Sequence, residues 1–127
     1  MGFDTYPTRS AEQTTASFHH LLGMYNRPNV KAARAAHGLD SPVRLLAVPD
    51  ANLGSQSTIG NRKETWSDVA AHEALWERVV MKSDLKDAFV AVAPFIFQSF
   101  PGWKGASAND TVRTRYEDWG RRLSAAP

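Results

Sequence analysis

The pattern of apolar and polar positions favours helices in the N-terminal part of the chain. Residues 11–25 carry apolar side chains at helical spacing, and Ser10 before them, with Gln13 three positions later, matches the pattern of a capping box. Residues 30–37 predict a second, shorter helix, which Gly38 would end because glycine readily adopts the left-handed conformation found after many helices.

The same periodicity continues in the C-terminal half. A helix that begins after Thr65 or Ser67 and ends near residue 81 would place Trp66 and Trp76 on one face. The last predicted helix is capped by Asn109 and carries a narrow apolar stripe. The members of this stripe are Val112, Tyr116, Trp119 and Leu123. Between these helices, residues 84–93 (DLKDAFVAVA) are expected to form a largely buried helix, because nearly every later position is apolar.

Two segments between the helices are less regular. Residues 41–49 (SPVRLLAVP) favour a short helix, because Ser followed by Pro is typical of a helix start, and a short strand is the alternative. Residues 49–64 are rich in Gly, Asn, Ser and Thr and predict a long polar loop. Such a loop is uncommon inside a compact domain unless it has a function.

Together these elements predict an all-α fold class, a small bundle of four or five helices with the long polar loop near residues 49–64. The length of 127 residues fits a single helical domain over 1–127, in which residues 1–9 form an irregular N-terminal arm. Apolar residues make up 43% of the chain and charged residues 22%, which is typical of a globular protein.

The composition also limits chemistry and location. Cysteine is absent, which excludes disulfides, a thiolate nucleophile and cysteine-ligated zinc. The N-terminus has no apolar segment typical of a signal peptide. The longest apolar run, residues 88–97, has 10 residues, whereas a membrane-spanning helix needs about 20. We therefore expect a soluble, intracellular protein with no membrane span.

Charge is unevenly distributed along the chain. Residues 27–63 carry six Lys and Arg against two acidic residues, whereas residues 64–90 carry three against six. The positive excess of the first segment favours an acidic partner, either nucleic acid or protein. A solvated surface with no partner is the plainer interpretation of the same charges.

The stretch LGSQSTIGNRKETW, residues 53–66, resembles the second half of the helix-turn-helix of phage repressors and Cro-like proteins. In that motif a small residue, a turn glycine four positions later and an apolar residue six positions further on hold two helices together. If Gly54 is the turn glycine, these packing positions fall on Asp50 and Gly60. The match therefore departs from the motif where the two helices must pack.

A second register, with Gly38 at the turn, places Arg34 and Arg44 at the packing positions. The resemblance implies a DNA-binding regulator that uses residues 29–66, and this is our alternative functional hypothesis. Phosphate contacts would come from Arg44, Arg62 and Lys63.

One carboxylate is predicted in an unusual place. Glu73 lies among apolar residues on the helical wheel, and His72 precedes it in a sequence that begins like the zinc motif HExxH but lacks its second histidine. A general acid or base in a Glu/His pocket is the third functional hypothesis. A buried ion pair with Arg113 or Arg115 and an exposed helix face are the structural alternatives. No metal site and no cofactor are predicted.

The hypothesis that we favour is contact with other proteins. No coherent catalytic set is present, so we lean against an enzyme. Phe100 and Trp103 flank a Pro-Gly turn away from any helical stripe, and exposed aromatic and Arg side chains are typical of protein interfaces. We therefore predict a non-enzymatic interaction module, or an accessory or structural subunit of a larger assembly, with Phe100, Trp103, Arg113 and Arg115 as partner-binding residues.

Overall fold

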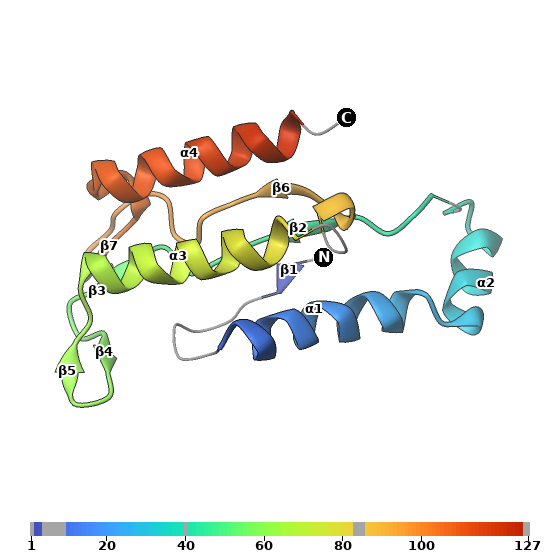
Figure 1. Cartoon of the computed structure of the whole chain (residues 1–127), viewed down its shortest axis with the longest axis horizontal. Helices are drawn as coiled ribbons and strands as arrows, with labels where there is room; N and C mark the ends of the chain where they lie inside the picture. Colours follow the sequence, from blue (N-terminus) through green and yellow to red (C-terminus); the bar gives the residue numbers. More distant parts are fainter. Residues whose placement is uncertain (1, 4–9, 40, 83–85, 126–127) are drawn as a thin grey trace.

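The computed structural model describes residues 2–3, 10–39, 41–82 and 86–125. Over this part of the chain the fold is mixed α/β: α-helices lie beside a small parallel sheet (Figure 1). The prediction of an all-α fold was therefore wrong. The predicted N-terminal arm, residues 1–9, lies outside the described residues except for a two-residue strand at Gly2–Phe3.

The main sheet has three parallel strands in the order β1-β2-β6. The strands are β1 (Gly2–Phe3), β2 (Leu45–Ala47) and β6 (Phe89–Val92). Each parallel connection requires a crossover, and helices lie within both of them. The first crossover contains α1 (Ala11–Tyr25) and α2 (Pro28–Ala36), and the second contains α3 (Trp66–Val80).

The fold class was predicted wrongly because two short apolar segments, expected as helices, form strands. The segment 86–92, predicted as a helix, forms a single 3-10 turn, η1 (Lys86–Ala88), followed by β6. Residues 45–47 form a strand, which was the alternative rather than the favoured prediction. Strands of a parallel sheet are often covered on both faces, so they appear as continuous apolar runs that periodicity cannot separate from a buried helix. Residues 84 and 85 of the predicted helix lie outside the described residues.

The four longer helices occur where the sequence predicts them. The Ser10 hydroxyl accepts the Gln13 N–H at 3.2 Å, and the Gln13 side chain accepts the Ser10 N–H at 2.9 Å, which completes the predicted capping box of α1. Gly38 follows α2 with φ of +71°. The Asn109 side chain accepts the Val112 N–H at 3.0 Å at the start of α4 (Asp110–Ser124). All four members of the α4 stripe are buried.

The predicted polar loop is largely structured. Its first strand, β3 (Leu53–Gly54), pairs antiparallel with β7 (Trp103–Lys104). The next two strands, β4 (Thr58–Ile59) and β5 (Arg62–Lys63), form a hairpin that projects from one end of the molecule (Figure 1). The segment predicted as a long polar loop therefore contains three short strands, and backbone pairing with a distant strand supplies order that local composition does not show.

The core lies between the helices and the sheet. The Phe18 ring of α1 meets Trp76 of α3 edge-on at 5.2 Å and Phe89 of β6 at 5.1 Å. Helix α4 contributes its stripe from the other side, with Trp119 fully buried. Within the described part of the chain, no helix has the length and apolar character needed to cross a bilayer.

Candidate functional site

A groove lies at the end of the molecule that carries the β4-β5 hairpin. Its volume is about 590 Å³, and it is formed where β3, β5 and β7 come together. Its walls include the apolar side chains of Leu53, Phe100 and Trp103 and the charged side chains of Lys63, Glu64 and Lys104. The groove therefore combines two of the predicted partner-binding residues with one residue predicted to bind nucleic acid.

A tight turn brings the two aromatic rings together. Phe100 and Trp103 exchange backbone hydrogen bonds of 3.0 and 2.9 Å around Pro101 and Gly102, and Gly102 has φ of +83°, a conformation that favours glycine. The ring centroids of Phe100 and Trp103 are 6.3 Å apart. The Phe-Pro-Gly-Trp sequence therefore holds both rings at the mouth of the groove.

Gly54 allows the Trp103 ring to lie against the β3 backbone. A Cβ atom at Gly54 would be only 2.8 Å from Cζ3 of Trp103 and 2.7 Å from the Ser57 hydroxyl oxygen. Any larger residue would therefore displace the indole. From the sequence, Gly54 was considered only as a possible turn glycine of the helix-turn-helix and was not identified as a site residue.

Aromatic exposure extends beyond the groove along the same segment. The exposed fractions of Phe95, Phe97, Phe100 and Trp103 are 52%, 45%, 48% and 41%. Four large aromatic side chains within nine residues therefore contact solvent. Large exposed apolar patches are more common at interaction surfaces than elsewhere, whereas single exposed apolar residues are ordinary.

The charged residues of the groove differ in their surroundings. Lys63 and Lys104 are exposed, whereas Glu64 is half-buried and burial raises the pKa of its carboxyl group. At neutral pH the two lysines outnumber the single acid. The lining of the groove therefore combines apolar side chains with an excess of positive charge.

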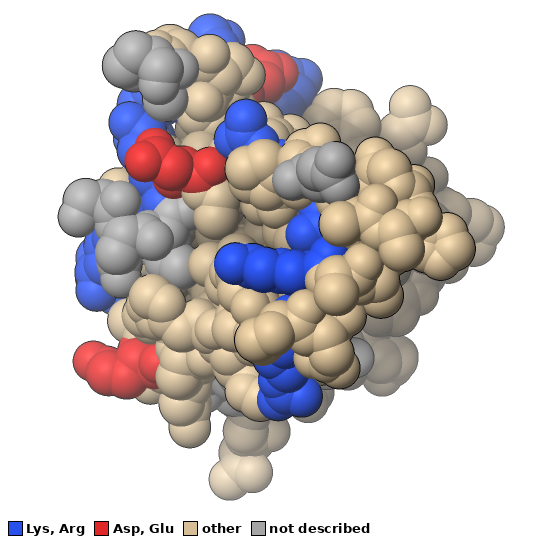
Figure 2. All heavy atoms as spheres, turned by 90° about the vertical axis from the view of Figure 1, so that its right-hand side faces the viewer, with Lys and Arg blue, Asp and Glu red and all other residues tan. Residues whose placement is uncertain are grey.

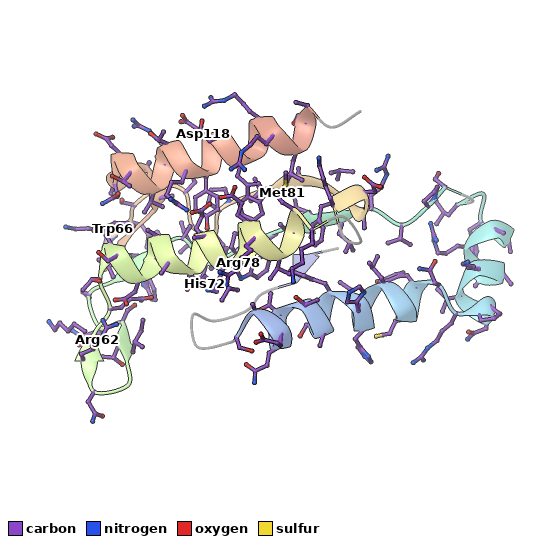
Figure 3. The ribbon with its side chains drawn as sticks, in the orientation of Figure 1. Arg62, Trp66, His72, Arg78, Met81 and Asp118 are labelled. Atoms are coloured by element: carbon purple, nitrogen blue, oxygen red, sulfur yellow. The ribbon has the colours of Figure 1, made fainter. Side chains whose placement is uncertain are left out.

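Arg62 is not available as a free phosphate contact. It makes two hydrogen bonds to the Asp68 carboxylate, at 2.7 and 2.6 Å, and so ties the hairpin to the first turn of α3. The Arg62 guanidinium and the Thr65 donors hold the pKa of Asp68 well below its usual range. Arg44 lies before β2, toward the α2 end of the molecule, and its Nη1 donates to the Asp87 carbonyl at 3.2 Å. Figures 1 and 3 show that the hairpin carrying Arg62 is at the opposite end from α2.

The three residues predicted to bind nucleic acid are therefore not brought together. The two-helix geometry of the helix-turn-helix is absent too: among described residues 41–65 there are strands and turns but no helix. Binding of nucleic acid remains a prediction that rests on charge.

Glu73 is buried and paired. Its side chain has no exposed surface, and its carboxylate accepts a hydrogen bond from Nε of Arg115 on α4. Burial raises the pKa of Glu73, and the Arg115 guanidinium opposes that rise. A substrate cannot reach a carboxylate with no exposed surface. The ion pair that the sequence offered as a structural alternative is thus the arrangement found.

His72 does not share a pocket with Glu73. It is buried beside Trp76, with ring centroids 6.1 Å apart, on the side of α3 that faces α1 (Figure 3), whereas Glu73 is bonded to α4. Neighbouring helical residues diverge by about 100°, which explains the separation. The described residues contain no group of three His, Asp or Glu side chains arranged to hold a metal ion.

The two arginines predicted to bind a partner lie on α4 rather than in the groove. Arg113 pairs with Asp110 at 3.0 Å and approaches Glu117 at 3.7 Å on its own helix. Arg115 is engaged with Glu73. Both side chains therefore form ion pairs within the fold. The cation that lies beside the aromatic residues is Lys104, which was not predicted as a site residue.

A comparison of the chain with protein families, with curated proteins and with solved structures finds no match to any of them. Function is therefore argued from the geometry of this chain alone.

Proposed function

We propose that the protein is a non-enzymatic interaction module, or an accessory subunit of a larger assembly, which binds a segment of a partner protein in the groove between β3, β5 and β7. The observation that supports this proposal is the exposure of Phe100 and Trp103 at the mouth of a preformed groove. Aromatic side chains held by a tight turn lose little conformational entropy on binding, which favours them as interface anchors.

The chemistry of the groove indicates the kind of segment that would bind. Leu53 and the two aromatic rings form an apolar surface that suits apolar side chains. Lys63 and Lys104 would attract acidic residues beside them. We therefore expect a partner segment with one or two apolar anchors flanked by Asp or Glu.

The other hypotheses have less support. An enzyme based on Glu73 would require a substrate to reach a fully buried carboxylate. A DNA-binding regulator would have to use Arg62, which is already bonded to Asp68, together with Arg44 at the other end of the molecule.

The test is the native mass of the protein purified from its own source, with absorbance at 260 and 280 nm measured across the peak. We expect a protein-only complex larger than the 14.0 kDa chain. Phe100→Ala or Trp103→Ala should release the chain from that complex while helix content stays unchanged. Met24→Ala, which removes an exposed apolar side chain from α1, is the matched control and should have no effect.

Several results would contradict the proposal. A bare chain at its own mass, or a complex that both aromatic variants leave intact, would show that the groove does not bind a partner. Loss of helix content in the aromatic variants would show that the two rings support the fold instead. A small species that carries nucleic acid would favour the DNA-binding alternative.

A further inference from the structure

A second cavity lies at the α2 end of the molecule, opposite the aromatic groove. Its volume is about 940 Å³, and it lies between α2, the segment that leads into β2, and η1. Three cationic side chains line it, Lys31, Arg34 and Arg44, against one carboxylate, Asp87. Figure 2 looks onto this end of the molecule and shows several Lys and Arg side chains across the middle of the face.

These cations have no carboxylate partner among the described residues. Arg34 donates from Nη2 to the Ser41 backbone carbonyl at 2.6 Å, and Arg44 donates from Nη1 to the Asp87 backbone carbonyl at 3.2 Å. A carbonyl is neutral, so neither bond neutralises the charge of its arginine, and each guanidinium keeps further N–H groups for a ligand. In contrast, five arginines elsewhere are in ion pairs: Arg62, Arg113, Arg115, Arg121 and Arg122.

The fold holds the two arginines in place. Gly38, in the left-handed conformation, ends α2 and turns the chain back, so that Ser41 comes within reach of Arg34 in the last turn of the helix. The bond from Arg44 joins the segment before β2 to η1. Each guanidinium therefore has one hydrogen bond to the backbone, which restricts its motion and reduces the entropy lost when it binds a ligand.

The charge of the cavity indicates the ligand. Among the described residues that line the cavity, three cations and one carboxylate give a net charge of about +2, which matches a phosphomonoester, whose charge at neutral pH is about −1.5 to −2, better than a single carboxylate. Planar guanidiniums also bind phosphate oxygens with two parallel hydrogen bonds. The remaining walls include the apolar side chains of Leu22 and Val43.

We propose that this cavity binds a small phosphate-bearing molecule. Its phosphate group lies between Arg34, Arg44 and Lys31, and its apolar or planar body packs against Leu22 and Val43. A cavity of this volume lies within the usual range for small-molecule sites, about 300 to 1,000 Å³. The site is separate from the aromatic groove, so its test does not depend on the proposed protein partner.

The test is a titration of the isotope-labelled protein, followed by amide chemical shifts, with three probes: phenyl phosphate, orthophosphate and benzoate. We expect phenyl phosphate to shift amides of residues 31–44 and to bind more tightly than either other probe, because it alone supplies both the dianion and the apolar body. Binding should weaken as salt concentration rises.

Variants then assign the charges. Arg44→Ala and Lys31→Ala should each weaken phenyl phosphate binding about tenfold, as expected for loss of a charge-assisted hydrogen bond. Asp87→Asn should strengthen binding severalfold, because it removes the one carboxylate among the described residues that line the cavity. Arg78→Ala, an exposed arginine on α3 outside the cavity, is the charge-matched control and should leave affinity unchanged.

Several results would overturn the proposal. They are the absence of shifts at residues 31–44, equal weakening in Arg78→Ala, or tighter binding of benzoate than of phenyl phosphate. Binding of a short single-stranded oligonucleotide where phenyl phosphate does not bind would also overturn it, in favour of a nucleic-acid surface. Arg44 also bonds to the Asp87 backbone carbonyl, so if Arg44→Ala unfolds the domain, Lys31→Ala gives the decisive loss of affinity.

Discussion

Arg115 on α4 donates its Nε–H to the carboxylate of Glu73 on α3, and this bond joins the two helices across the core. The Glu73 side chain is fully buried, whereas that of Arg115 is 40% exposed, so only one partner of the pair contacts solvent. Arg122 and Glu77 form a second ion pair between the same helices, nearer the surface. Ion pairs as well as apolar packing therefore stabilise the contact between α3 and α4.

Arg115→Ala should destabilise the protein by about 2 kcal/mol at neutral pH, because it leaves a buried carboxylate without its cationic partner, although solvent near the exposed arginine limits the cost. The free energy of unfolding, measured by urea denaturation, tests this. Arg113→Ala, which removes an arginine from the same helix without affecting Glu73, should cost much less.

The cost of Arg115→Ala should depend on pH. Burial raises the pKa of Glu73 above its ordinary value of 4.5, and removal of Arg115 raises it further. The folded state then holds its proton more tightly than the unfolded chain, so the variant loses stability as pH rises above the unfolded carboxyl pKa. The deficit should be small at about pH 4 and full near about pH 8. In the Glu73→Gln background, the loss of stability caused by Arg115→Ala should not vary with pH. With Glu73 present, an equal loss of stability at both pH values would exclude Glu73 as the source of that loss.

Asp68→Ala should release the β4-β5 hairpin from α3. Asp68 receives both bonds from Arg62 and also accepts the Thr65 N–H at 2.8 Å, so its loss removes the tie between the two elements. Hydrogen exchange at residues 58–63 should speed up while exchange in α4 stays slow. In the unaltered protein, the pKa of Asp68 is lowered, so its contribution is complete above about pH 4 and disappears as pH falls through the lowered value. Unchanged exchange in the variant would mean that strand pairing alone fixes the hairpin.

Two glycine substitutions should have opposite effects on stability. A Cβ atom at Gly120, within α4, would lie 3.7 Å from Cγ1 of Val92, an ordinary contact, so Gly120→Ala should stabilise the protein by about 0.5 to 1 kcal/mol. A Cβ atom at Gly105 would lie 2.4 Å from the backbone oxygen of Phe97, so Gly105→Ala should destabilise it by about 2 kcal/mol. Thermal unfolding measures both, and the same sign for the two variants would contradict the packing described here.

Gly54→Ala should disturb the aromatic groove without unfolding the domain. The new methyl group would collide with the Trp103 ring and the Ser57 hydroxyl, both of which are side-chain atoms that can move. The indole N–H resonance of Trp103 should shift, and association with the proposed partner should weaken. Gly23→Ala in α1, where a Cβ atom meets no neighbour within 4 Å, serves as control. An unshifted Trp103 resonance would show that the ring does not rest on Gly54.

The sequence predicts the helices of this fold well and its strands poorly. The cap of α4 and its apolar stripe depend on interactions within a few residues, which the local sequence specifies. β6 depends on pairing with β2, a segment far away in the chain, and its run Phe-Val-Ala-Val fits a buried helix equally well. Non-local pairing is therefore the information that pattern analysis lacked.

The same contrast between local and non-local interactions applies to the site residues. Phe100 and Trp103 were predicted from a local turn signal, and the structure places both at one groove. Lys104 and Gly54 reach that groove only through β3-β7 pairing. Arg113 and Arg115 were predicted to be available for a partner, but ion pairs within the fold engage both of them. The sequence suggests several possible carboxylate partners for these arginines, and only the three-dimensional structure shows which of them form the ion pairs.

The pairing of β2 with β6 also has a consequence for how the domain folds. The hydrogen bond from the Asn52 side chain to the Phe95 carbonyl, a few residues beyond the ends of these strands, closes a span of 43 positions along the chain. A helical bundle gains stability from neighbouring contacts as each helix forms, whereas this sheet requires closure of a long loop first. During synthesis β2 has no partner on its β6 side until Val92 leaves the ribosome. The sheet surface against which α4 packs therefore forms late, and folding is completed by the last third of the chain.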